Sequence, residues 1–352
     1  MKELHIGDKI AKVPVIQGGM GVGVSLSSLA GAVAANGGIG IISTAQIGYD
    51  EPDFKTNTKE ANKRAIEKHV KKALEQANGG LVGVNVMTAL KDYAEHVRTA
   101  AKAGADVIIC GAGLPTDLPE LVEGTDSKFA PIVSSEKAVS ILFKMWEKKY
   151  NKTADFVVIE GPKAGGHLGF SADQVAKFLS DEENFDDEIV KIIKRVRAQE
   201  KKYDKHIPVI VAGGIFDSKD VKHALELGAD GVQVASRFVA TRECDADIRY
   251  KQAYIDATKE NIQIIKSPVG MPGRALRNKF IEKVEQSACK VEKCYGCLAK
   301  CKPAEIPYCI TDALIKAVKG DIDNGLVFCG SNTGRITQIS TVKQVMEELM
   351  AF

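Results

Sequence analysis

Short, nearly continuous apolar runs are the feature that most constrains the fold of this chain. They are rich in Val and Ile and lack the polar alternation of a half-exposed strand, which is typical of parallel strands covered on both faces. Stretches with helical periodicity separate them. The runs begin at residues 13, 39, 81, 106, 131, 156, 208 and 231. This alternation predicts an α/β fold with a closed (β/α)8 TIM barrel, and an open doubly wound sheet is the alternative.

Local signals mark where the helices between these runs begin. Ser25 is the expected cap of the first helix, and Asp217 or Ser218 is the expected cap of a later one. The sequences KAGADVI and ELGADGV, at residues 102–108 and 226–232, both run from a helix end into a strand. This echo supports a repeated helix–strand unit.

The alternation of apolar runs and helical stretches ends near residue 260. We therefore predict three parts: residues 1–262 as the main part of the barrel, residues 263–335 as a cysteine-rich lid insertion over the barrel mouth, and residues 336–352 as a C-terminal helix that packs on the barrel.

Composition and charge narrow the classes of partner. The formal net charge is +2 and no basic patch dominates, so no nucleic-acid partner is expected. No apolar run reaches the roughly 18 residues that a membrane span needs. The first residues lack the apolar core of a signal peptide, which predicts a cytoplasmic protein. A small-molecule substrate is the expected partner, and homo-oligomerisation is left open.

Glycine-rich turns follow most of the predicted strands. In a barrel, the carboxyl ends of the strands carry the catalytic groups. Glycines there let a flat or phosphorylated ligand approach the backbone. The pair Gly213 and Gly214 follows the seventh strand, and Ser236 and Arg237 follow the eighth. Amides at these two ends are the usual place for a phosphate in a barrel, although each turn could also serve only to connect strand and helix.

His167 is the candidate catalytic residue. It stands in the turn GPKAGGHLG after the sixth strand, whereas the other histidines lie in terminal, helical or surface-like contexts. An imidazole titrates near neutral pH and can act as a base or as a positive charge. The alternative for any lone histidine is a purely structural role.

Five of the eight cysteines lie between residues 289 and 309. The core of this group is CYGCLAKCKP, and closely spaced thiolates suit zinc or an iron–sulfur cluster. The predicted metal ligands are Cys289, Cys294, Cys297 and Cys301. The alternative is a set of reduced thiols that brace the lid.

Several of these motifs together resemble the nitronate monooxygenase family, formerly called 2-nitropropane dioxygenases. The related flavin-type enoyl-ACP reductases share the pattern. The resemblance spans residues 16 to 244 and is carried by IQGGMG, GVNVM, GAGLP, EGPKAGGHLG, VIVAGGI and GVQVASRFVATREC.

The resemblance implies a barrel that binds FMN and a catalytic role for the histidine of the AGGH turn, which is His167 here. It places the flavin ring and the phosphate beside the glycine turns. The implied cofactor-binding residues are Gly18, Gly19, Met20, Asn85, Glu160, Lys163, Gly165, Gly166, Gly213, Gly214, Ala235 and Ser236.

Two positions depart from the pattern of many family members. Glu160 stands where a neutral amide is common, and Lys163 replaces an acid. A carboxylate beside an anionic flavin is unfavourable unless it is hydrogen-bonded or paired, and Lys163 is the candidate partner.

The resemblance implies an FMN-dependent oxidoreductase that oxidises alkyl nitronates with O2 to a carbonyl compound and nitrite. The alternative enzyme is an NAD(P)H-dependent flavin reductase of enoyl thioesters. The non-enzymatic alternative is a sensor barrel that binds a metal or a phosphorylated ligand, with the cysteine-rich tail as its sensing part.

Overall fold

The computed structural model describes residues 3–180, 182–287, 289 and 291–352, and it contains the predicted closed barrel. The eight parallel strands pair in the order β10-β11-β3-β4-β5-β6-β7-β8. They are β3 (Val15–Gln17), β4 (Ile39–Ser43), β5 (Leu81–Met87), β6 (Val107–Gly111), β7 (Lys128–Val133), β8 (Val157–Glu160), β10 (Val209–Ala212) and β11 (Gly231–Val234). The (β/α)8 fold class is therefore confirmed, and the open sheet is excluded.

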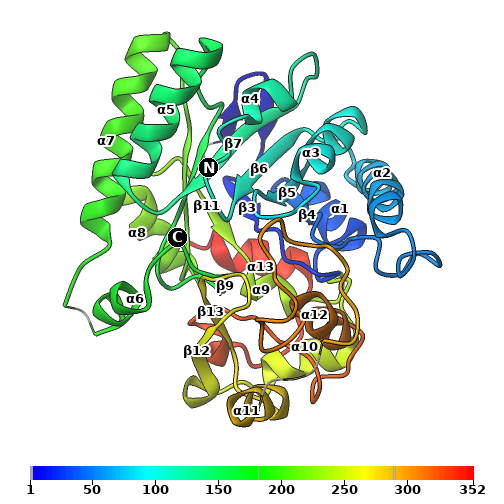
Figure 1. The fold of residues 1–352 in the computed structure, drawn as a ribbon. Helices are drawn as coiled ribbons and strands as arrows, with labels where there is room; N and C mark the ends of the chain where they lie inside the picture. Colours follow the sequence, from blue (N-terminus) through cyan, green and yellow to red (C-terminus); the bar gives the residue numbers. More distant parts are fainter. Residues whose placement is uncertain (1–2, 181, 288, 290) are drawn as a thin grey trace.

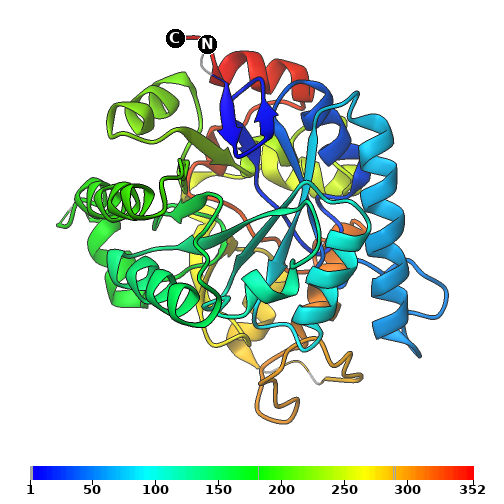
Figure 2. The same ribbon diagram turned by 90° about the horizontal axis from the view of Figure 1, so that it is seen from above.

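Helices surround the strands as an outer ring (Figure 2). Between strands of the barrel lie α1 (Ser27–Ala35), α2 (Thr58–Gln76), α3 (Tyr93–Lys102), α4 (Leu118–Leu121), α5 (Glu136–Tyr150), α6 (Ala172–Leu179), α7 (Asp186–Tyr203) and α8 (Ser218–Glu226). After the last strand come α9 (Ser236–Val239), α10 (Ile248–Ile255), α11 (Lys279–Gln286), α12 (Ile310–Val318) and α13 (Val342–Leu349), and two 3-10 turns, η1 (Lys259–Asn261) and η2 (Thr333–Arg335). The helix α13 packs against α1, α8 and α9.

An N-terminal hairpin fills the amino-terminal end of the barrel. Its strands β1 (Leu4–Ile6) and β2 (Lys9–Ala11) pair antiparallel. Its apolar side chains join the cluster inside the barrel, next to residues at the starts of strands such as Ile39 and Leu81. Lys9 also donates to Asp106, directly before β6, at 2.8 Å. Because this end is packed, a ligand can reach the barrel axis only from the carboxyl ends of the strands.

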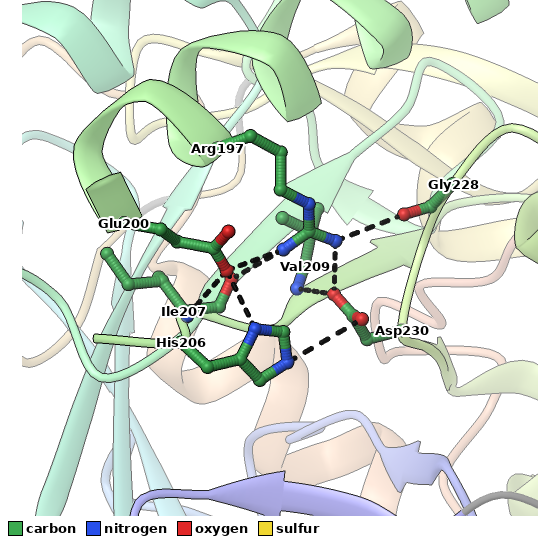
Figure 3. Close-up of polar contacts among 7 residues, drawn as sticks. All are labelled: Arg197, Glu200, His206, Ile207, Val209, Gly228 and Asp230. Atoms are coloured by element: carbon green, nitrogen blue, oxygen red, sulfur yellow. Dashed lines mark hydrogen bonds and ion pairs between the residues drawn. The ribbon is translucent and has the colours of Figure 1, made fainter. Parts of the chain in front are cut away.

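Three aspartates repeat one contact around the amino-terminal rim. Each precedes a strand and accepts the N–H of a residue at the start of the neighbouring strand. The bonds join Asp106 to Val82 (3.0 Å), Asp155 to Phe129 (2.9 Å) and Asp230 to Val209 (2.8 Å). Each aspartate also forms an ion pair with a basic side chain. For Asp230 this side chain is Arg197, at 2.7 Å, and Figure 3 shows the surrounding contacts. This contact explains the aspartate of the GAD sequence that is repeated at residues 104–106 and 228–230.

The cap of α1 differs from the prediction. The helix begins at Ser27, and Ser25 instead accepts a hydrogen bond from the N–H of Met20 at 2.8 Å. The first turn is capped from a distant segment, because the Asp245 carboxylate accepts the N–H groups of Leu26, Ser28 and Leu29. Ser25 as a helix cap was wrong. The cap of α8 is Asp217, which is one of the two residues predicted for it.

A small antiparallel sheet stands beside the barrel. It has the order β12-β13-β9, with β12 (Ile262–Lys266), β13 (Pro272–Leu276) and β9 (Gly166–His167). Figure 1 shows β12, β13, α11 and α12 gathered at one end of the molecule. Because β9 comes from the loop after β8, the C-terminal segment is joined to the barrel through this loop. The predicted boundaries near residues 262 and 335 stay predictions.

In the part of the chain that the structure describes, no helix combines the length and apolarity needed to cross a bilayer.

Candidate active site

A cavity of about 250 Å³ lies at the carboxyl ends of the barrel strands. All thirteen residues predicted for catalysis and flavin binding line it. They are Gly18, Gly19, Met20, Asn85, Glu160, Lys163, Gly165, Gly166, His167, Gly213, Gly214, Ala235 and Ser236. Residues from five strand ends thus meet around one space, and their individual roles stay predictions.

The two last strands of the barrel present free backbone donors to this cavity. Gly213 and Gly214 have φ angles of +91° and +100°, in the region that favours glycine. Among the described residues, no protein acceptor pairs with the N–H groups of Gly213, Gly214 or Ser236. A cluster of unpaired amides of this kind suits an anion such as a phosphate.

The C-terminal segment supports this amide cluster. The Ser236 hydroxyl accepts the N–H of Gly330 at 3.0 Å. The Asn332 side-chain amide donates to the carbonyl of Gly214 at 2.6 Å. These two contacts engage the Ser236 hydroxyl and the Gly214 carbonyl, and they leave the N–H groups of the cluster unpaired. The run 328–332 also lines the cavity, so the chain that follows α12 forms part of the site.

Glycines after β3 form another wall of the cavity. A Cβ added at Gly19 would lie 2.4 Å from Cβ of Asn85 and 3.2 Å from Ile41. The Asn85 side chain donates to the carbonyl of Ile109 at 3.3 Å. The backbone at Gly19 therefore packs directly on the end of β5, and only a residue without a side chain leaves this wall flat.

His167 is held from two sides. Its backbone lies opposite Gly273 in the small sheet, and its Nε2 is 2.7 Å from the hydroxyl of Ser267. The ring of Phe328 packs edge-on against the imidazole, with 4.9 Å between ring centroids. Burial lowers the pKa of His167 to about 4. The imidazole is consequently uncharged near neutral pH and can accept a proton or donate a hydrogen bond.

A buried arginine holds the turn that carries His167. Arg274 in β13 is 2% exposed, and its guanidinium donates to the carbonyl of Ala164. The Arg274 carbonyl accepts the N–H of Cys329 at 3.1 Å. A Cβ at Gly165 would lie 2.6 Å from the Cys329 backbone, so the two loops pack closely. Arg274 therefore ties the histidine turn to the C-terminal wall of the cavity.

Sequence reasoning missed Ser267, Arg274 and Phe328. They lie about a hundred residues or more beyond the histidine turn in the chain, and the antiparallel pairing of β13 with β9 brings them beside it. A short strand of two residues such as β9 gives no periodic signal from which this pairing could be predicted.

The cysteine-rich segment does not form the predicted metal site. Among the described residues, no group of three or more His, Cys, Asp or Glu side chains could hold a metal ion. Cys289 and Cys297 pack with an apolar cluster, whereas Cys294 is exposed. Burial raises the pKa of Cys297 and Cys301.

The predicted cysteine-rich lid is also not confirmed. Within the described part of residues 263–335, the cavity is lined by Leu314 and the run 328–332, and by none of the cysteines between 289 and 309. The cysteine-rich segment instead packs on the loop after β5. Ala299 donates its N–H to the Ala89 carbonyl at 3.0 Å, and Lys91 donates to Cys297 at 3.1 Å.

The fold and the cavity define a TIM-barrel enzyme with a ligand site at the carboxyl ends of its strands. Residues 4–351 match the family model described as nitronate monooxygenase, and the chain therefore belongs to this family of flavin-dependent oxidoreductases. A curated relative, the probable nitronate monooxygenase of Bacillus subtilis strain 168, is 24% identical over 373 residues, covering 96% of this chain and 94% of the relative.

Two solved structures show the same architecture. FabK from Thermotoga maritima is 25% identical, has a TM-score of 0.73, and covers 97% of this chain and 92% of its own. The nitroalkane oxidase from Streptomyces ansochromogenes has a TM-score of 0.69 with 97% and 95% coverage, and at 19% identity it supports the fold alone.

Proposed function

We propose that this protein is an FMN-dependent nitronate monooxygenase, which oxidises alkyl nitronates with O2 to a carbonyl compound and nitrite. The observation that carries the proposal is the single cavity lined by His167 and by every glycine turn predicted for the flavin. Family membership supports the flavin, and the arrangement of this cavity supports FMN in particular.

The residues of the cavity fit FMN in two respects. The unpaired amides of Gly213, Gly214 and Ser236 suit the phosphate. Gly18 and Gly19 line the cavity with backbone that carries no side chain, which suits the close approach of a planar ring system. FMN, when bound, supplies the electron-accepting chemistry that the side chains lack.

His167 would manage the proton of the substrate. As an uncharged imidazole, it can take the proton from the carbon beside a nitro group and so generate the nitronate at the site. Toward a nitronate that arrives already formed, the same ring can donate a hydrogen bond. The contact with Ser267 orients the ring, and Phe328 keeps water away from one side of it.

A reductase of enoyl thioesters is the second candidate. Flavin-type enoyl-ACP reductases share the sequence motifs of this chain, and the FabK structure matches 97% of it. In this function NAD(P)H would be the electron donor, and His167 would donate a hydrogen bond to the carbonyl of the thioester substrate.

One experiment separates these candidates. The purified protein is first examined by absorption spectroscopy, where FMN gives a yellow protein. It is then mixed without oxygen with NADH, with NADPH, or with an alkyl nitronate. Bleaching of the flavin by the nitronate alone supports the monooxygenase, and rapid bleaching by a nicotinamide supports the reductase. A colourless protein that binds no FMN would refute both.

A further inference from the structure

Glu160 is a carboxylate without a partner in the wall of the cavity. It is the last residue of β8 and lies opposite Ala212 of β10 in the ladder. It lines the cavity and shares the inner face of the barrel with Phe156 and Val158. Among the described residues, nothing forms an ion pair with Glu160 or donates a hydrogen bond to its carboxylate, and this includes Lys163, the partner predicted from the sequence.

Neither of the two basic side chains that line the cavity, Lys163 and Arg237, pairs with Glu160. Lys163 is exposed, and its aliphatic stem covers Gly214, where an added Cβ would lie 2.9 Å from Lys163 Cβ. Arg237 donates to the carbonyl of Phe216 at 2.9 Å and pairs with Glu348. The remaining titratable groups of the cavity are uncharged near neutral pH. Burial lowers the pKa of His167 to about 4 and raises the pKa values of Tyr250, Tyr254 and Cys329 further above neutrality.

The adjoining strand ends offer no compensation either. Ala212 of β10 lies opposite Glu160, and Ile132 of β7 lies opposite Val158, two residues before it; both line the cavity and are apolar. Burial alone raises the pKa of Glu160 to about 7. A ligand that covers this carboxyl removes the remaining water and, in the case of FMN, brings a phosphate with a charge close to −2.

We propose that Glu160 becomes a neutral carboxylic acid when FMN binds, so that cofactor binding takes up one proton from solution. In this form the carboxyl can donate a hydrogen bond to an oxygen of the cofactor, which a carboxylate cannot do. The inference rests on the proposed binding of FMN, and it adds that the complex holds one more proton, on Glu160, than the free protein.

The proposal fixes the sign of the pH dependence. Protonation is favoured in the complex over the free protein, so the affinity for FMN falls as the pH rises above the pKa of Glu160 in the free protein. Each pH unit in that range changes the affinity about tenfold. Between pH 7 and pH 9 the dissociation constant of FMN should therefore increase roughly 50-fold, with the phosphate, whose second pKa is about 6, fully ionised throughout.

The experiment titrates flavin-free protein with FMN from pH 7 to pH 9 and follows the fluorescence of FMN. The parent protein should show the roughly 50-fold weakening, and Glu160→Gln should bind with an affinity that is nearly constant over this range. Lys163→Met is the matched control and should keep the slope of the parent. If the affinity of the parent for FMN does not change with pH, and a pH dependence appears only in Lys163→Met, then Lys163 neutralises Glu160 in the parent. That result would overturn the proposal.

A second measurement needs no variant. Calorimetric titration of the parent protein at pH 8 in two buffers with different ionisation enthalpies counts the protons that FMN binding takes up. A value near one supports the proposal, and a value near zero overturns it even though FMN binds. Failure to bind FMN at any pH would instead refute the proposed function.

Discussion

The imidazole of His167 is prepared for proton transfer by its surroundings. Burial keeps it uncharged, and Ser267 holds Nε2 at 2.7 Å. We expect His167→Asn to retain FMN and to lower turnover by about 10²–10⁴, the usual contribution of a general acid or base. The steady-state rate and the flavin content of parent and variant, measured on the same substrate, test this expectation.

The pH profile provides the control for this variant. Because the pKa of His167 lies at about 4, the base form persists through neutral pH, and its contribution to the rate should not change between pH 6 and pH 8. Equal turnover of parent and variant on every accepted substrate would remove the catalytic role.

Glu160 should also affect the stability of the flavin-free protein. Its pKa rises from 4.5 to about 7 on folding, so the folded state binds the proton more tightly than the unfolded state. The corresponding stability is present below pH 4.5 and is lost as the pH rises through about 7. Glu160→Gln should therefore stabilise the protein by about 1–2 kcal/mol at pH 8, with the full shift discounted because the carboxyl reaches the cavity.

Thermal unfolding of both flavin-free proteins checks this at two pH values. The variant should melt at a higher temperature than the parent at pH 8, and the difference should shrink at pH 5, where Glu160 is protonated in the folded state. A constant difference at both pH values would show that packing, and not the proton, determines the effect.

Some site residues could be predicted from local sequence and others could not. His167 and the glycines follow apolar runs directly, and the carboxyl ends of parallel strands must meet. Ser267 and Arg274 reach the site through the pairing of β13 with β9. Nothing in the sequence of either strand indicates which strand it pairs with.

At the level of elements, the aspartates of the amino-terminal rim join neighbouring strands. Asp230 accepts the N–H of Val209 at 2.8 Å and pairs with Arg197 at 2.7 Å. Asp230→Ala leaves both donors without this acceptor, and we expect a loss of about 1–3 kcal/mol. Asp230→Asn retains an oxygen for the N–H and should lose less. Chemical denaturation measures both.

The exposed pair of Lys222 and Glu226 in α8 supplies a control. Their charged atoms are 3.9 Å apart and both side chains are more than 60% exposed. Glu226→Ala should change the free energy of unfolding by less than about 0.5 kcal/mol. A comparable loss in both alanine variants would mean that the rim contact has no special importance.

Sequence-based prediction of the elements depended on the range of each interaction. Asp217 caps α8 from the adjacent position and was among the predicted options. Asp245 caps α1 from more than two hundred residues away, and the nearby Ser25 was chosen wrongly. The cysteines show the same limit, since their spacing is compatible with a metal site but their burial differs from one to the next.

For the whole molecule, the barrel follows from the sequence because each strand–helix unit repeats one pattern. The placement of the C-terminal segment does not, because its strands pair with a loop of the barrel. The cysteine-rich chain after α11 accordingly lies on the loop following β5 and outside the cavity wall, where the sequence predicted a lid.

This division of the molecule predicts the pattern of protection by FMN. The cavity joins the carboxyl ends of the barrel strands with the run 328–332, so a bound ligand should slow amide hydrogen exchange at residues 160–167, 213–214 and 328–332. Residues 291–309 line no part of the cavity and contain no helix or strand, so their exchange should be unchanged by FMN, and it should be fast except at bonded N–H groups such as that of Ala299. At a hundredfold excess of FMN over its dissociation constant, the folded state should gain about 2.7 kcal/mol overall. Strong protection of residues 291–309 by FMN would show that this segment closes over the ligand, as the sequence-based prediction of a lid requires.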